Sequence, residues 1–176
     1  MQRPTPVEYP EFYHRYANIV PDGNLMTAFQ TCHQNTHLAL RGIKNEIADF
    51  AYAEGKWTIK QIIQHLIDSE RVFAYRALRI GRGDTTPLAG FDENKYAEAI
   101  NVHSLSLDEL LGEFHMVRLT TMQLFSRFTP EQCLQMGTAN GGEISVRALA
   151  FIIIGHEIHH LNIIKERYLS EFKNEL

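Results

Sequence analysis

The sequence predicts an all-α protein built as a four-helix bundle. Four stretches of about twenty residues each carry apolar side chains three or four positions apart, which is the spacing of one helix face. Serine or threonine stands where three of these stretches begin, and segments rich in glycine or proline separate them. Helices with a single apolar stripe bury it by packing against one another, so a bundle is the expected architecture.

Length, composition and charge are those of a globular protein with its own core. A chain of 176 residues fits one domain, 1–176, and a domain of this size buries about 70% of its unfolded surface. The net charge of −4 is spread without the basic stripe that a nucleic acid requires. Cys32 and Cys133 are too few for a disulfide framework. The N-terminus lacks the apolar segment of a signal peptide, and the longest apolar run, 148–154, is too short to cross a membrane. We therefore expect a cytoplasmic protein that binds neither nucleic acid nor membrane.

The chain begins with an N-terminal arm, residues 1–24. Four prolines and the turn-forming sequence 21–24 predict extended chain, with a short helical turn around Tyr13. The first helix is predicted from Leu25 to Ile47, and a break centred on Gly55 follows. The stripe of this helix consists of Leu25, Phe29, Cys32, Thr36, Leu40, Ile43 and Ile47.

A capping box begins the second helix. Thr58 is the N-cap, and Gln61 three residues later completes the box. The helix ends at Gly81-Arg82-Gly83-Asp84. Residues 82–92 are too many for a tight turn and predict a long crossover between the second and third long helices.

The third helix also begins with a capping box. Ser106 and Glu109 form it, and the apolar spacing continues to Phe128. Between the crossover and this box, residues 92–100 predict a short helix.

A glycine-rich segment separates the third helix from the last. Residues 137–143 are the strongest loop signal in the chain, although 135–144 is also compatible with a short strand. Ser145 then caps the last helix, which is predicted to run to about Glu171.

Two histidines of the last helix have the spacing of a metal-ligand pair. His156 and His160 are four residues apart and project about 40° from each other on one face. Leu149, Ile153 and Ile163 share that face. Two imidazoles in an apolar stripe can hold one metal ion between them, and burying them without a partner is costly.

A third ligand has to come from another helix at the same depth of the bundle. His65 is the best candidate, because it lies at one margin of the stripe of the second helix. Its narrow face also carries Gln61, Ser69, Val72 and Arg76. A lone helical histidine is more often an ordinary hydrogen-bonded side chain, so the case for His65 depends on the pair.

Four short motifs occur in a specific order along the chain. They are Trp57-Thr58-Ile59-Lys60, Gln64-His65-Leu66-Ile67-Asp68-Ser69-Glu70, Phe91-Asp92-Glu93 and Gly155-His156-Glu157-Ile158-His159-His160. Each motif is weak by itself, but their order and separation resemble those of the DinB-like superfamily of bacterial four-helix proteins, which includes bacillithiol transferases. The resemblance covers nearly the whole chain.

This resemblance implies a fold, a metal and partners. It implies an up-up-down-down bundle, commonly a homodimer, with metal ligands at His65, His156 and His160. It also implies a divalent metal ion, zinc or nickel most often. In several relatives the metal activates a low-molecular-weight thiol, and many others have no known reaction.

The same histidines also match the zinc-protease motif H-E-x-x-H. In that alternative Glu157 is the general base. The extended form of the motif fails, because Ile163 and Glu166 stand where a glycine and a third histidine are required. Glu157 also lies 100° round the helix from His156, which points it away from the metal. We therefore treat the protease as a minor alternative.

Other histidines and two arginines are expected in supporting positions. His33 and His37 are also four residues apart but lack an evident third partner, so surface or supporting placement is expected. His159 points some 60° away from His156, so we expect it either to orient a neighbouring side chain or to lie at a helix interface. Arg76 and Arg79 are expected to form structural salt bridges, with Asp68 or Glu93 as partners, and binding of a substrate carboxylate is the alternative.

Two functional hypotheses follow. The first is a metal-dependent enzyme that carries out thiol transfer or hydrolysis on a small molecule, because three imidazoles leave a coordination position open. The second is a non-catalytic bundle that serves as a stress-response binding or dimer module. Hydrogen bonds from the ligands to Asp68, Glu93 or Glu157 would favour the enzyme. No catalytic residue is assigned beyond the ligands.

Overall fold

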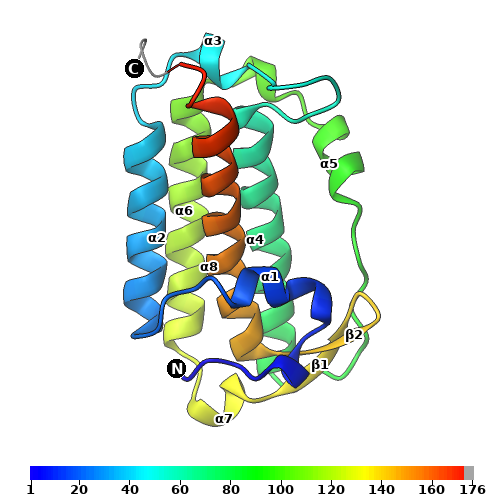
Figure 1. Ribbon diagram of the computed structural model, residues 1–176. Helices are drawn as coiled ribbons and strands as arrows, with labels where there is room; N and C mark the ends of the chain where they lie inside the picture. The colour runs from blue at the N-terminus through cyan, green and yellow to red at the C-terminus, as the bar shows by residue number, and fades with distance from the viewer. Residues whose placement is uncertain (173–176) are drawn as a thin grey trace.

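The protein is a bundle of four long helices, seen in a computed structural model that describes residues 1–172 (Figure 1). Short elements close both ends of the bundle. In chain order the elements are η1 (Pro6–Glu8), η2 (Glu11–Tyr13), α1 (His14–Ala17), α2 (Leu25–Leu40), α3 (Asn45–Ala48), α4 (Ile59–Gly81), α5 (Glu93–Ala99), η3 (Val102–Ser104), α6 (Leu107–Ser126), α7 (Pro130–Cys133), β1 (Met136–Ala139), β2 (Gly142–Ser145), α8 (Val146–Ile163) and η4 (Ile164–Tyr168).

The long helices α2 and α8 run in one direction, and α4 and α6 run in the other (Figure 1). At one end of the bundle, Leu25 and Val146 from helix starts pack in one cluster with Ile80 and Phe125 from helix ends. The order is therefore up-down-down-up, which corrects the expected up-up-down-down order. An up-up-down-down bundle needs two end-to-end crossovers. Here the predicted crossover between the second and third long helices is confirmed, and the other two connections return at the end where they began (Figure 1).

Two of the predicted helices end earlier than expected. The first stops at Leu40, because Arg41 is extended and Gly42 takes the left-handed conformation, with φ of 79°, that ends many helices. The rest of the predicted stretch forms a separate short helix, α3, which buries Ile47. The α-helical part of the last helix ends at Ile163. A π-helical turn, η4, then extends the segment to Tyr168, so it stops short of Glu171.

The other predicted elements are found where the sequence placed them. Thr58 and Gln61 exchange hydrogen bonds of 3.2 and 2.9 Å as a capping box, and Ser106 and Glu109 do the same. The arm contains its helical turn, as η2 and α1, and the crossover contains its short helix, α5.

The predicted loop 137–143 is mostly an antiparallel β-hairpin. Met136 pairs with Ser145 and Ala139 pairs with Gly142. Asn140 and Gly141 have φ of 51° and 76°, which is the left-handed pair that a two-residue hairpin turn requires. The strand considered for 135–144 is thus confirmed, and Asn-Gly is the turn signal that supports it.

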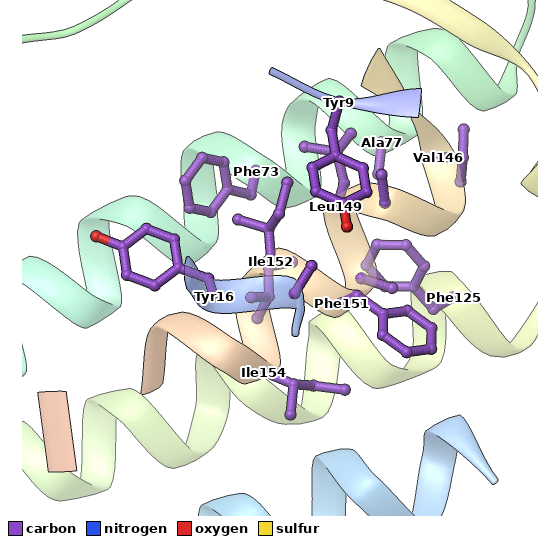
Figure 2. Packing of buried hydrophobic residues seen from close by; sticks show 14 of the residues in the cluster. Tyr9, Tyr16, Phe73, Ala77, Phe125, Val146, Leu149, Phe151, Ile152 and Ile154 are labelled. Carbon is purple, nitrogen blue, oxygen red and sulfur yellow. The ribbon is translucent and has the colours of Figure 1, made fainter. Parts of the chain in front are cut away.

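The arm packs across α8 by way of Gly155. A Cβ atom at this position would lie 1.9 Å from the backbone oxygen of Tyr16, so only glycine allows this approach. Figure 2 shows Tyr16 beside Phe73 of α4, in the cluster that also buries Ile152 and Ile154 of α8. None of the helices within residues 1–172 combines the length and apolarity needed to cross a membrane.

Candidate metal centre

The three histidines singled out in the sequence meet at one point between α4 and α8. The Nε2 atom of His156 lies 2.9 Å from Nε2 of His65 and 3.0 Å from Nε2 of His160. All three candidate ligand atoms fall within 4.8 Å of one another. Within α8 the spacing of four residues stacks two of the rings on one face, and the packing of α4 supplies the third. The predicted convergence of the three side chains is therefore present.

Burial keeps all three imidazoles neutral, which is the form that binds metal. Desolvation lowers the pKa of His65 to about 4 and that of His160 to about 3. Burial and the neighbouring imidazoles lower the pKa of His156 well below 6.5. A neutral ring nitrogen either carries a proton or offers a lone pair, and Nε2 of His156 cannot do both toward its two neighbours. A divalent cation would accept all three lone pairs, so this donor set fits a metal ion.

Hydrogen bonds to the outer ring nitrogens are few. Ser69 Oγ lies 3.4 Å from Nδ1 of His65. Nδ1 of His160 is buried and has no hydrogen-bond partner among the described residues. Asp68 accepts a 3.0 Å hydrogen bond from Gln64 instead, so none of the carboxylates considered from the sequence is seen to orient a ligand.

Aromatic rings hold the histidines in place. Trp57 tilts against His65 with ring centroids 4.8 Å apart, and Tyr16 meets His156 edge-on at 5.0 Å. Phe73 contacts His156 from α4 at 6.2 Å. The orientation of the three histidines thus depends on packing more than on hydrogen bonds.

Glu157 points away from the centre. Its Oε2 atom lies 2.7 Å from Nη1 of Arg118, and both side chains are 1% exposed. Arg118 also binds Glu70 through contacts of 2.7 and 2.9 Å. A glutamate held in this buried network cannot act on a molecule at the histidines, which counts against the protease alternative.

A cavity of about 480 Å³ opens beside the three histidines. Such a volume accommodates a small molecule. A hollow of about 550 Å³ at another part of the bundle is slightly larger, but no three of its described lining residues can share a metal ion. The wall of the histidine cavity includes the aromatic side chains Phe12, Tyr13, Tyr16, Trp57, Phe73 and Phe91, the charged side chains Arg15, Arg76 and Glu93, and also His159.

The remaining histidines lie outside the triad. Nε2 of His33 is 3.0 Å from Nδ1 of His115, a contact between α2 and α6 that nothing in the sequence indicated. His37 is exposed, as expected. The ring of His159 lies 5.3 Å from that of Tyr16 and 5.2 Å from that of His160, beside the triad.

The two arginines of α4 differ from expectation and from each other. Arg79 forms a salt bridge with Asp84 rather than with Asp68 or Glu93. Arg76 has no carboxylate partner among the described residues, and donates one hydrogen bond of 2.8 Å to the backbone oxygen of Ala89.

Several cavity residues had no signal in the sequence. Tyr13 and Tyr16 come from the arm, and Asn140 comes from the turn of the hairpin. Both segments lie outside the histidine motifs, so only their packing against α4 and α8 reveals their position. Ser69 and Arg76 had a local clue, since they share a narrow face of the second helix with His65.

The fold and the site together define a four-helix bundle with an open three-histidine centre in the wall of a cavity. Within that class, the chain belongs to the DinB superfamily, whose family model matches residues 28–164. This confirms the resemblance of the sequence motifs.

Three known proteins extend the comparison. OB0413 of Oceanobacillus iheyensis, named as a candidate metal-dependent hydrolase, is 29% identical over 128 residues, which cover 72% of this chain and 73% of that protein. OB0782 of the same organism, with the same name, is 30% identical over 125 residues, or 68% of this chain and 69% of that protein. The structure of YfiT from Bacillus subtilis, described as a candidate metal-dependent hydrolase with an unusual four-helix bundle topology, matches with a TM-score of 0.76 and 16% identity. It covers 90% of this chain and 98% of YfiT, which shows the shared fold.

Proposed function

We propose that this protein is a metal-dependent hydrolase of a small molecule, with a divalent metal ion held by His65, His156 and His160. The observation that carries the proposal is the convergence of three neutral Nε2 atoms in the wall of a cavity of about 480 Å³. The names of the relatives support the reaction class. Three protein ligands leave a position for substrate or water, as catalytic sites do.

The side chains of the cavity supply binding and proton transfer. A divalent cation in the triad would act as a Lewis acid, which lowers the pKa of water or of a thiol that binds to it. The aromatic rings exclude bulk water from the ligands and pack against the apolar part of a substrate. Outside the triad, Glu93 and His159 are the described lining residues whose side chains are of the kinds that most often serve as general bases. Burial and Arg15 lower the pKa of His159, so its neutral form is available.

Thiol transfer is the second candidate. Neither cysteine lines the cavity, and burial among acidic neighbours raises the pKa of Cys32. The nucleophilic sulfur would therefore belong to a low-molecular-weight thiol that enters as a second substrate. Hydrolysis and thiol transfer differ only in the nucleophile, so one product assay with and without added thiol separates them.

Metal content is the first measurement. The untagged protein is grown in medium with zinc and nickel, purified, and its metals are measured by mass spectrometry. We expect about one equivalent per chain, with zinc or nickel as the main metal, and its loss in His65→Ala and in His160→Ala. The matched control is His37→Ala, an exposed histidine outside the cavity, which keeps the metal.

Activity is the second measurement. The metal-loaded protein is screened on small esters, amides and thioesters, and hydrolysis is expected to require both the metal and His160. Metal content below about a tenth of an equivalent, unchanged by either triad substitution, would overturn the metal site. Hydrolysis that persists in His65→Ala after metal removal would overturn the mechanism.

A further inference from the structure

Arg76 places an enclosed positive charge in the wall of the candidate active-site cavity. It follows His65 by eleven residues on α4, so it lies only about 20° round the helix and roughly 16 Å further along the axis. Its side chain is nearly inaccessible, with 3% of the residue exposed. Arg76 and His65 line the same cavity, which therefore extends along this face of α4.

The guanidinium group lacks the partner that a buried charge requires. Of the two buried arginines in residues 1–172, Arg118 contacts two carboxylates and Arg76 contacts none within 4 Å. Glu93 lines the cavity, but it forms no ion pair with Arg76. The one hydrogen bond goes to the neutral oxygen of Ala89, whereas a guanidinium has five N–H donors. Because a buried charge is costly without a counter-charge, this site favours an anion.

The surroundings of Arg76 determine the shape of that anion. The rings of Phe73 and Phe91 lie 5.8 and 6.0 Å from its Cζ atom, so apolar surface borders the charge. A planar guanidinium binds a planar carboxylate through two parallel hydrogen bonds. Arg15 adds a second positive charge to the cavity at an exposed position, and Glu93 is the one acidic side chain among its described lining residues.

We propose that Arg76 binds a carboxylate group of the substrate, at the end of the molecule remote from the bond that is cleaved. The substrate class is then a small molecule with an apolar body and a terminal carboxylate. The reacting group would lie at the triad and the carboxylate at Arg76. This inference rests on the proposed function for its choice of reacting end, but the carboxylate site itself does not require the metal.

The test compares carboxylates with their neutral amides. Phenylacetate, benzoate and their neutral amides, phenylacetamide and benzamide, are each titrated into the full untagged chain by calorimetry. The titrations are done with zinc bound and again after metal removal. We expect the wild-type protein to prefer each carboxylate by about ten- to a hundredfold, as for hydrogen bonds to a charged group, in both states. Arg76→Gln should abolish this preference and leave amide binding unchanged. Arg76→Lys should keep part of it, because the charge remains without the planar fork.

Two controls make the result decisive. Arg15→Gln removes an exposed charge from the same cavity and should leave most of the preference. An equal loss in Arg15→Gln would mean general electrostatic attraction and would overturn the assignment to Arg76. No binding of either carboxylate to the wild-type protein at millimolar concentration, or an undiminished preference in Arg76→Gln, would also overturn it.

Thermal unfolding separates a binding role from a structural one. If the charge is retained for binding, Arg76→Met should leave the unfolding midpoint unchanged or raise it, since it removes an unpaired buried charge. A fall as large as that caused by Arg118→Met would assign Arg76 to the core and overturn the proposal. The preference is also measured on the metal-free protein, so a failed hydrolase proposal and a failed carboxylate site give different results.

Discussion

His156 and Glu157 are neighbours in the sequence with separate roles in the structure. One helical step of 100° turns His156 toward the cavity and Glu157 toward the buried Arg118. The H-E-x-x-H pattern is therefore satisfied by sequence alone, without the geometry of a general base. The direction of Glu157 follows from helix periodicity, but its partner comes from another helix and is visible only in the structure.

Gly155 is the residue on which the position of the arm depends. In Gly155→Ala the new Cβ would overlap the backbone oxygen of Tyr16, so the arm has to move. We expect a loss of about 1–3 kcal/mol in the free energy of unfolding, measured by urea denaturation, because the backbone clash outweighs the better helix propensity of alanine. The control is Gly112→Ala on α6, where no atom would meet the new Cβ. That variant should gain up to about 1 kcal/mol. A gain in both variants would contradict the close approach.

At the scale of elements, a buried ion network joins α4, α6 and α8. Arg118 of α6 contacts Glu70 of α4 and Glu157 of α8, and all three side chains are at most 2% exposed. Such networks are costly to desolvate. Removing one member destabilises the protein strongly, because it leaves a buried charge without a counter-charge. This network also holds α4 and α8, which carry the three histidines, at a fixed separation.

Removing the cation from this network should destabilise the bundle. Arg118→Met leaves two buried carboxylates without a counter-charge, and we expect a loss of about 3–5 kcal/mol in the free energy of unfolding. Arg71→Met on α4 is the matched control, since Arg71 is 50% exposed in its pair with Glu113 and should cost less than about 1 kcal/mol. Replacing both glutamates with glutamine in the Arg118→Met background should restore much of the loss. Equal effects of the two arginine substitutions would show that the buried network has no special weight.

At the scale of the whole molecule, the arm covers the cavity and is attached to the start of α8. Glu8 accepts hydrogen bonds of 2.7 Å from Nε of Arg147 and 2.8 Å from Oγ of Ser145. The arm supplies Tyr13 and Tyr16 to the cavity wall, so this attachment contributes to the site as well as to the fold.

The attachment of the arm should weaken in acid. Burial by itself raises the pKa of Glu8, but hydrogen bonds from Arg147, the backbone of Thr5 and Ser145 outweigh it and lower the pKa from 4.5 to about 2. A lowered folded-state pKa stabilises the protein above the unfolded value, and this contribution disappears as the pH falls from about 4.5 to about 2. Glu8→Gln should therefore cost about 1–2 kcal/mol at pH 7, after allowance for solvent screening, and progressively less below pH 4.5. Unfolding of both proteins across this range measures the difference. A difference that stays constant with pH would contradict the ion pair. Glu11→Gln, at an exposed position of the same arm, is the control variant.

The assembly of the protein stays a prediction. The homodimer implied by the family resemblance can be tested by sedimentation equilibrium of the untagged chain, in which twice the monomer mass is the expected result.

The sequence by itself determined the local features of this protein. Apolar spacing located the four long helices, and the capping boxes at Thr58 and Ser106 fixed two of their starts, because these signals involve residues within one or two turns. The pair His156 and His160 was visible for the same reason, and His65 was added by its place in an ordered set of motifs. The early end of α2 at Leu40 was missed, because Gly42 marks a helix end only if the chain takes the left-handed conformation there.

The tertiary structure alone decided the features that join distant segments. The up-down-down-up order depends on which end each connection returns to, and helix periodicity carries no information about that. The partners of Glu157 and Arg79, and the lack of one for Arg76, depend on which side chains packing brings together. The cavity wall combines the arm, the crossover and the hairpin, three segments whose common position follows from burying apolar surface against α4 and α8.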